Sequence, residues 1–150
     1  MAIDLGTAST IIAVKGRGVV LDEPSLVAIN EMNEEIVAFG HEAFDMTGRE
    51  GRDVVVRAPL TGGVVGDFER TKKMLAHFVK KARTGGSNLS LQAVMSMVSD
   101  VTQVEQRALL NAAEESHIGK VFMMEEALAA AFGAGVLSTD KRASAIIDIG

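Results

Sequence analysis

The first fourteen residues constrain the fold of this 150-residue chain more than any other segment. Residues 1–3 and 11–14 are apolar runs, and a Gly-Thr turn with small polar neighbours joins them. Two apolar strands around such a turn predict a β-hairpin. A second turn at 16–18 and a third short strand at 19–21 follow. We therefore expect the chain to open with a three-stranded meander.

The tip of this hairpin has the composition of a phosphate site. Gly6 lets the main chain approach a ligand closely, and Thr7, Ala8 and Ser9 are small enough for their amides to point at phosphate oxygens. Asp4, at the end of the first strand, would hold a hydrated Mg²⁺ against those phosphates. The turn leads to a strand and lacks the Gly-Lys-Ser/Thr of a Walker loop. Taken alone, it fits an ordinary hairpin equally well.

Composition narrows the class of protein. The chain is 47% apolar and 23% charged, as in soluble globular proteins. It has no cysteine, and its three histidines are scattered, so neither a thiolate site nor a zinc site is expected. A net charge of −5 argues against nucleic acid as a partner. With neither a signal core nor an apolar run of about 20 residues, the expected compartment is the cytoplasm.

The remaining sequence predicts two kinds of structure. Residues 22–60 have the pattern of a small α+β insertion, with strands at 26–29, 36–39 and 54–56 and a helix at 41–46. After an amphipathic helix at 68–82, capped by Asp67, strands and helices alternate. The alternating elements are a strand at 93–98, a helix from the capping box at 102–105 to about 116, a strand at 120–124, a helix at 127–132 and a strand at 145–149. Such alternation predicts parallel strands with right-handed crossovers.

The end of the chain suggests a longer protein. The apolar strand expected at 145–149 stops where a loop should begin. A strand buried in a sheet rarely ends a natural chain. We therefore expect this sequence to be the N-terminal part of a larger protein.

The order of these elements resembles the first domain of the actin and heat-shock-chaperone ATPase superfamily. Within it, the sequence resembles the MreB-like bacterial actins. The matching stretches span the chain in order: 3–8, 14–21, 23–25, 40–43, 59–60, 63–65, 67–68, 102–105, 125–126, 129–131, 133–135 and 148–150. The resemblance implies an α/β, actin-like ATPase (ribonuclease H-like) domain with a mixed sheet: a three-stranded meander, then βαβαβ, plus the small insertion. Subdomain IA would comprise 1–21 and 61–150, subdomain IB would be 22–60, and the second domain would be absent from this chain.

The resemblance also implies a role for each site residue. The cofactors would be ATP and Mg²⁺, with Asp4 positioning the metal through water and the amides of Gly6 to Ser9 holding the phosphates. Glu126 would orient or activate the attacking water, and Glu125 would only favour the positive end of its helix. Asp148 would begin a second phosphate loop, with Gly150, and lie near the metal. Two departures bear on this site: Ala127 stands where the family usually has Pro, and 97–100 lack its Val-Pro and Gly.

A membrane contact is a further hypothesis. Lys73, His77, Lys80 and Lys81 share one helix face, which by default is merely solvated. Leu89 and Leu91 follow where MreB-like proteins place an apolar membrane-touching loop. Cations beside an inserted apolar tip favour an anionic leaflet.

The resemblance therefore implies a whole protein that polymerises, lies in the cytoplasm and peripherally at the inner membrane, and governs cell shape with the cell-wall synthesis machinery. Its ATP hydrolysis would regulate filament turnover, and the 150 residues alone would be inactive. A specialised bacterial actin that positions an organelle or plasmid is an alternative. A non-polymerising chaperone-type ATPase is another.

Overall fold

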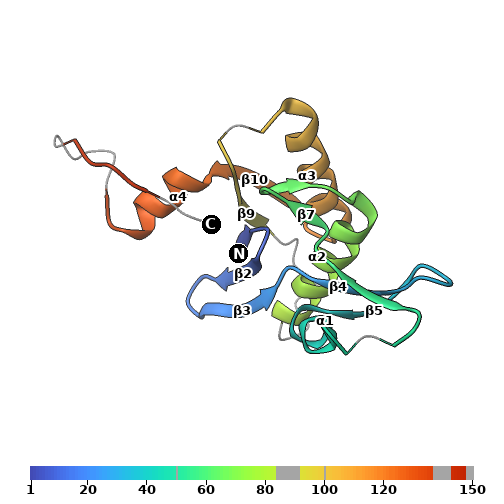
Figure 1. The fold of residues 1–150 in the computed structure, drawn as a ribbon. Helices are drawn as coiled ribbons and strands as arrows, with labels where there is room; N and C mark the ends of the chain where they lie inside the picture. The colour runs from blue at the N-terminus through green and yellow to red at the C-terminus, as the bar shows by residue number, and fades with distance from the viewer. Residues whose placement is uncertain (50, 84–91, 100, 137–142, 148–150) are drawn as a thin grey trace.

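A five-stranded mixed sheet forms the centre of the molecule (Figure 1). The computed structural model describes residues 1–49, 51–83, 92–99, 101–136 and 143–147. The strands, in the sheet order β10-β9-β1-β2-β3, are β10 (Lys120–Glu125), β9 (Gln92–Met97), β1 (Ala2–Leu5), β2 (Ser9–Val14) and β3 (Gly18–Pro24). β1, β2 and β3 form the predicted antiparallel meander, and β9 is parallel to both β1 and β10. The sequence prediction is confirmed for this part of the fold.

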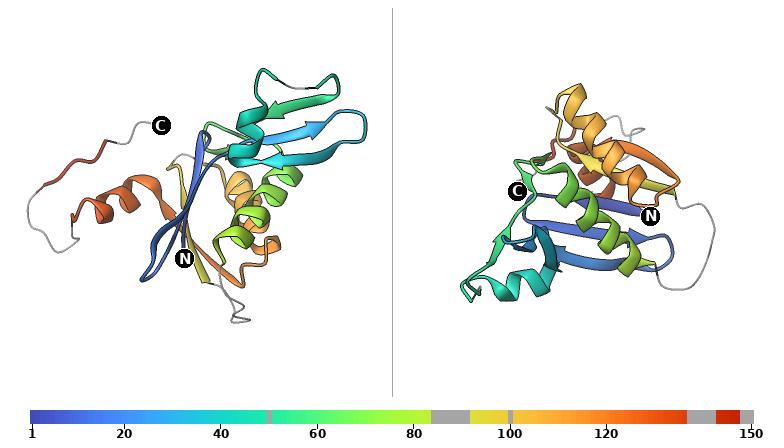
Figure 2. Two further views of the ribbon diagram at one scale, coloured as in Figure 1. Left: turned by 90° about the horizontal axis from the view of Figure 1, so that it is seen from below. Right: turned by 90° about the vertical axis from the view of Figure 1, so that its right-hand side faces the viewer.

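Two helices cover one face of this sheet (Figure 2). In α2 (Phe68–Ala82), apolar residues at helical spacing, including Met74, Leu75 and Phe78, are buried in the main core. α3 (Gln103–Glu115) lies beside α2 and begins with the predicted capping box of Thr102 and Glu105. In β1 the side chains of Ile3 and Leu5 are buried, whereas Ala2 and Asp4 are exposed. Strand alternation thus places Asp4 on the face opposite the buried one.

A second, smaller sheet is inserted between β3 and α2. It consists of β4 (Val27–Asn30), β5 (Glu35–Phe39) and β6 (Val54–Arg57), in the order β5-β4-β6, with helix α1 (Gly40–Met46) against it. Ala28 packs in a small cluster with Ala38 and Ala43 of α1, whereas Val27 and Ile29 join the main core. The small sheet is therefore buried on both faces along β4. A short hairpin, β7 (Leu60–Thr61) with β8 (Val64–Val65), leads to α2; β7 was not predicted.

One buried carboxylate joins the main sheet to helices α1 and α2. Glu23, at the end of β3, is only 6% exposed. It accepts a hydrogen bond from the His41 amide of α1 at 2.8 Å and pairs with Lys81 of α2 at 2.6 Å. Gly40 has φ +61°, and a side chain there would run into this carboxylate. Only glycine fits here, because the turn into α1 passes directly over Glu23.

The C-terminal elements leave the main body. Helix α4 (Glu126–Gly133) has no buried residue and extends from the sheet face opposite α2 and α3 (Figure 2, left). The strand predicted at 145–149 is wrong over 145–147, where the structure has no strand and Ile147 is 83% exposed. Residues 148–149 lie outside the described residues. A strand requires a partner for its backbone bonds, and no strand in the described part of the chain pairs with this segment.

In the part of the chain that the structure describes, no helix is long and apolar enough to cross a lipid bilayer.

Candidate functional site

Three parallel strands place two of the predicted site residues, Asp4 and Glu126, at one edge of the main sheet. Ile3 of β1 lies beside Met95 of β9, and Met97 lies beside Glu125 of β10. Asp4 near the end of β1 and Glu126 just after β10 therefore lie at the carboxyl edge of the parallel strands, where α/β sheets bind ligands. With strands about 4.8 Å apart, β1 and β10 are separated by about 10 Å. One strand, β9, therefore lies between the strand that carries Asp4 and the strand that leads to Glu126.

Ser96 orients the Asp4 carboxylate. Asp4 is exposed, and the Ser96 hydroxyl on β9 donates a hydrogen bond to Asp4 Oδ1 at 2.7 Å. Mg²⁺ prefers oxygen ligands and usually keeps waters, bound through one or two carboxylates and substrate phosphates. Among the described residues no group of three or more His, Cys, Asp and Glu could hold a metal. The exposed Asp4 carboxylate, oriented by Ser96, is an oxygen ligand of the kind that Mg²⁺ prefers.

The hairpin tip between β1 and β2 is tight and accessible. The Gly6 amide donates to the Ser9 carbonyl at 3.0 Å, which closes the turn. A Cβ on Gly6 would lie 2.9 Å from that carbonyl oxygen, so the turn requires glycine. Ala8 is exposed, and Thr7 and Ser9 are half-buried. The tip therefore presents main chain with little side-chain cover, as a phosphate cradle requires.

Residues distant in sequence hold this tip in place. The Gly63 amide, in the turn between β7 and β8, donates to Thr7 Oγ1 at 2.7 Å. Ser25 Oγ donates to the Gly6 carbonyl at 2.6 Å, and the Ser25 amide donates to the Ala8 carbonyl at 3.0 Å. The hairpin is thus bonded to the segments that lead into and out of the small sheet. Sequence reasoning missed Ser25, Gly63 and Ser96.

Glu126 is placed at the start of a helix. Glu125 ends β10 and occupies the N-cap of α4 without a side-chain capping bond, and Glu126 is the first helical residue. A carboxylate here is stabilised by the positive end of the helix dipole. Glu126 is half-buried. Asp148 and Gly150 lie outside the described residues, as do Leu89 and Leu91.

The basic face of α2 is partly engaged within the protein. Lys81 is paired with Glu23, and the His77 ring stacks on Phe39 of β5, with ring centroids 4.5 Å apart. Burial and the neighbouring Lys81 ammonium lower the pKa of His77. Lys81 and His77 are exposed, as a solvated face predicts, and each also contacts a neighbouring side chain of the protein. Lys73 and Lys80 are exposed.

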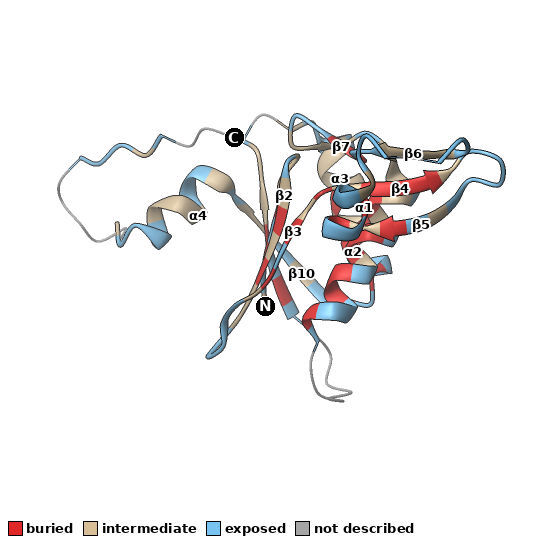
Figure 3. Ribbon diagram, turned by 60° about the horizontal axis from the view of Figure 1, so that its bottom comes forward, coloured by how far each residue is buried: buried red, intermediate tan, exposed pale blue. Residues whose placement is uncertain are grey.

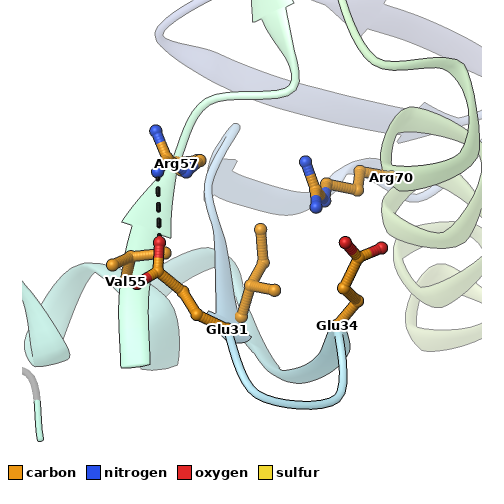
Figure 4. Close-up of a pocket in the computed structure, with 6 residues that line it drawn as sticks. Glu31, Glu34, Val55, Arg57 and Arg70 are labelled. Carbon is orange, nitrogen blue, oxygen red and sulfur yellow. Dashed lines mark hydrogen bonds and ion pairs between the residues drawn. The ribbon is translucent and has the colours of Figure 1, made fainter. Parts of the chain in front are cut away.

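A separate hollow of about 340 Å³ lies between the small sheet and α2 (Figure 4). Its lining consists of Ile29, Glu31, Glu34, Val55, Arg57 and Arg70. Arg57 is paired with Glu31 at 3.3 Å, and Arg70 is paired with Asp67 at 2.6 Å. None of the predicted site residues lines this hollow.

Sequence comparison matches one protein family over the whole chain. The family model of the MreB/Mbl protein matches residues 1–150. The cell shape-determining protein Mbl of Bacillus subtilis (strain 168) is 40% identical over 150 residues, and MreB of Escherichia coli (strain K12) is 39% identical over 155. Each alignment covers 100% of this chain and 45% of the relative. The chain therefore spans less than half the length of these relatives.

Solved structures show the same likeness. MreB5 of Spiroplasma citri bound to ADP superposes with a TM-score of 0.80 at 36% identity, covering 89% of this chain and 40% of that one. A MamK double helical filament gives 0.74 at 24% identity, covering 89% and 42%. At that identity the second match supports the fold alone.

The mixed sheet, its inserted small sheet and these superpositions define an α/β protein of the actin-like fold class. Its sequence matches the MreB/Mbl model from the first residue to the last. The chain belongs to the MreB/Mbl family.

Proposed function

We propose that this chain forms part of an ATP- and Mg²⁺-binding bacterial actin that polymerises and determines cell shape. The observation that carries the proposal is the convergence of Asp4, the hairpin tip and Glu126 at one sheet edge. Relatives matched over the whole chain are named cell shape-determining proteins, and MreB5 of Spiroplasma citri was solved with ADP and with AMPPNP.

Each residue then has a defined task in phosphoryl transfer. The amides of Thr7 to Ser9 bind the β- and γ-phosphates, whereas the Gly6 amide, which the sequence alone assigned to this role, closes the turn on the Ser9 carbonyl. Asp4, held by Ser96, would bind waters of a metal ion. A Mg²⁺ ion held there would supply neutralisation of the charge on the phosphate oxygens. The Glu126 carboxylate orients a water or accepts its proton. We further propose that Asp148 and Gly150 belong to a second phosphate loop, because the sequence resembles the MreB-like bacterial actins at these positions.

The proposed domain division follows the two sheets except within β3, which continues in the main sheet to Pro24. Residues 1–21 and 61–150 would form subdomain IA, and 22–60 would form subdomain IB. In support, β4, β5, β6 and α1 share a small apolar cluster of their own. The second domain of an actin-like protein would lie outside this chain.

The proposed partners are further copies of the protein, the inner membrane surface and the cell-wall synthesis machinery. The protein would act in the cytoplasm and peripherally at that membrane. Names of the matched relatives favour cell shape over organelle or plasmid positioning and over a chaperone-type ATPase.

Hydrolysis by the protein at its full encoded length tests the site. We expect Glu126→Gln to lower kcat for ATP by at least about 100-fold, because the water loses its general base. KM should stay within about threefold, since the phosphate contacts remain. Glu125→Gln is the matched control, because it removes the adjacent carboxylate from the helix start. Equal kcat values for the two variants would reject the role of Glu126.

Sedimentation with liposomes tests the membrane contact. Changing Leu89 and Leu91 to Ser should reduce binding to vesicles of anionic lipid, because the apolar tip is lost. Lys80→Gln should reduce binding to anionic vesicles more than to neutral ones, since each surface cation contributes about 1 kcal/mol. Binding that neither change alters would remove the membrane from the proposal.

A further inference from the structure

Two buried hydroxyl groups lie directly beneath the hairpin tip. Thr10 on β2 and Ser25 after β3 are both 0% exposed, and their hydroxyl oxygens are 2.8 Å apart. Buried hydroxyl groups are costly unless they are hydrogen-bonded, so such a pair in a core needs partners. These two have partners, because the pair ends on the backbone of the hairpin.

The direction of the hydrogen bonds follows from the number of protons. The only hydroxyl proton of Ser25 is donated to the Gly6 carbonyl at 2.6 Å. Thr10 must therefore donate to Ser25, which leaves a directed chain from Thr10 to Ser25 to Gly6. The Ser25 amide donates separately to the Ala8 carbonyl at 3.0 Å. One residue thus holds two carbonyl groups of the tip.

This arrangement fixes where the hairpin amides point. In a trans peptide unit the C=O and the following N–H point in opposite directions. Because the Gly6 carbonyl is drawn toward Ser25, the Thr7 N–H is turned away from it. In the same way, the Ala8 carbonyl bond turns the Ser9 N–H away from Ser25. Both amides are then directed away from the buried hydroxyl groups.

We propose that Ser25, supported by Thr10, is a positioning residue that aims the Thr7 and Ser9 amides at the phosphates of a bound nucleotide. The inference rests on the proposed nucleotide site. Preorganised amides bind charge without the cost of reorientation, so their alignment determines affinity. Ser25 acts through the backbone and needs no contact with the ligand.

Nucleotide titration of variants at the full encoded length tests this role. Ser25→Ala frees the Gly6 carbonyl but keeps the Ala8 bond, so we expect the Kd for ADP to rise about tenfold, the equivalent of one lost hydrogen bond. Thr10→Val, which keeps the shape and removes the proton donor, should raise it about threefold. Thr10→Ser restores the donor and should bind within about twofold of the wild type.

Ser116 provides a matched control. It is 1% exposed, and its hydroxyl donates to the Ala112 carbonyl at 2.6 Å, at the end of α3 remote from the carboxyl edge. Ser116→Ala should therefore destabilise the protein without changing the Kd for ADP. Circular dichroism at the titration temperature checks that each variant is folded.

The outcomes separate this inference from the proposal on which it rests. A wild-type protein that binds no ADP would overturn the proposed function, and this inference with it. A wild type that binds ADP while Ser25→Ala and Thr10→Val bind equally well would overturn the positioning role alone. Equal losses of affinity in Ser25→Ala and Ser116→Ala would also overturn it, because the effect would then be general destabilisation.

Discussion

At the scale of single residues, polar groups far apart in sequence determine the geometry. The hairpin that carries Asp4 and Gly6 to Ser9 could be predicted because these residues form one contiguous motif. Ser25 and Ser96 could not, because they lie 19 and 92 residues from the groups they bind. The burial of Thr10 could have been predicted. Thr10 lies two residues before the buried Ile12 in β2, so both side chains point to the inward face of the sheet.

Glu23 makes stability depend on pH. Burial alone would raise its pKa, but the bonds from Lys81 and the His41 amide outweigh burial and hold the pKa below its ordinary 4.5. The carboxylate therefore stabilises the fold above pH 4.5, and this contribution is lost as the pH falls through the lowered pKa. We expect Glu23→Gln to cost about 1–2 kcal/mol at pH 7, with the exposure of Lys81 limiting the effect.

Urea unfolding at several pH values checks this prediction. The difference between wild type and Glu23→Gln should shrink as the pH is lowered below 4.5. Glu31→Gln is the control, because its ion pair with Arg57 is exposed (Figure 4) and worth about 0.5 kcal/mol or less. A difference between wild type and Glu23→Gln that stays constant from neutral pH to acid would contradict the role of the Glu23 carboxylate.

At the scale of elements, the sequence predicted best those helices and strands that are stabilised by interactions between residues close in the chain. The helix predicted at 68–82 has those bounds, because its cap and its apolar spacing agree. The strand predicted at 145–149 is wrong over 145–147. The prediction rested on apolar residues alone, and a strand also needs a neighbouring strand to accept and donate its backbone hydrogen bonds. β7 was missed because a two-residue strand has no periodicity to detect.

Removing the cap of α2 should weaken the fold. Asp67 accepts the Arg70 amide at 3.0 Å, so Asp67→Ala should lower the free energy of unfolding by about 1 kcal/mol. Asp22→Ala removes the same charge from an exposed position on β3 and should cost less than about 0.5 kcal/mol. The midpoints of urea denaturation give both values. Identical midpoints for the two variants would show that the cap contributes nothing.

At the scale of the whole molecule, burial is uneven: α2 carries many buried residues, whereas α4 carries none (Figure 3). α2 and α3 cover one face of the sheet, while Phe122 of β10 is 46% exposed. On α4, Leu128 is 49% and Phe132 is 48% exposed. Patches of this kind bind hydrophobic dyes and promote association.

We therefore expect the 150-residue chain to bind anilinonaphthalene sulfonate and to scatter light as its concentration rises. Changing Leu128 and Phe132 to Ser should lower both signals with little change in Tm, because α4 buries no residue. Val104→Ser, at a 79% exposed position on α3, is the control and should leave both signals unchanged. Dye binding that the α4 changes do not reduce would assign the signal to another surface.

The central claim is that the carboxyl edge of the main sheet holds the phosphates of a nucleotide. A structure of the protein at its full encoded length, with AMPPNP and Mg²⁺, tests it most directly. We expect phosphate oxygens within about 3 Å of the Thr7 and Ser9 amides, with a metal-bound water on Asp4. A nucleotide bound elsewhere, with these amides and Asp4 not in contact with it, would contradict the account.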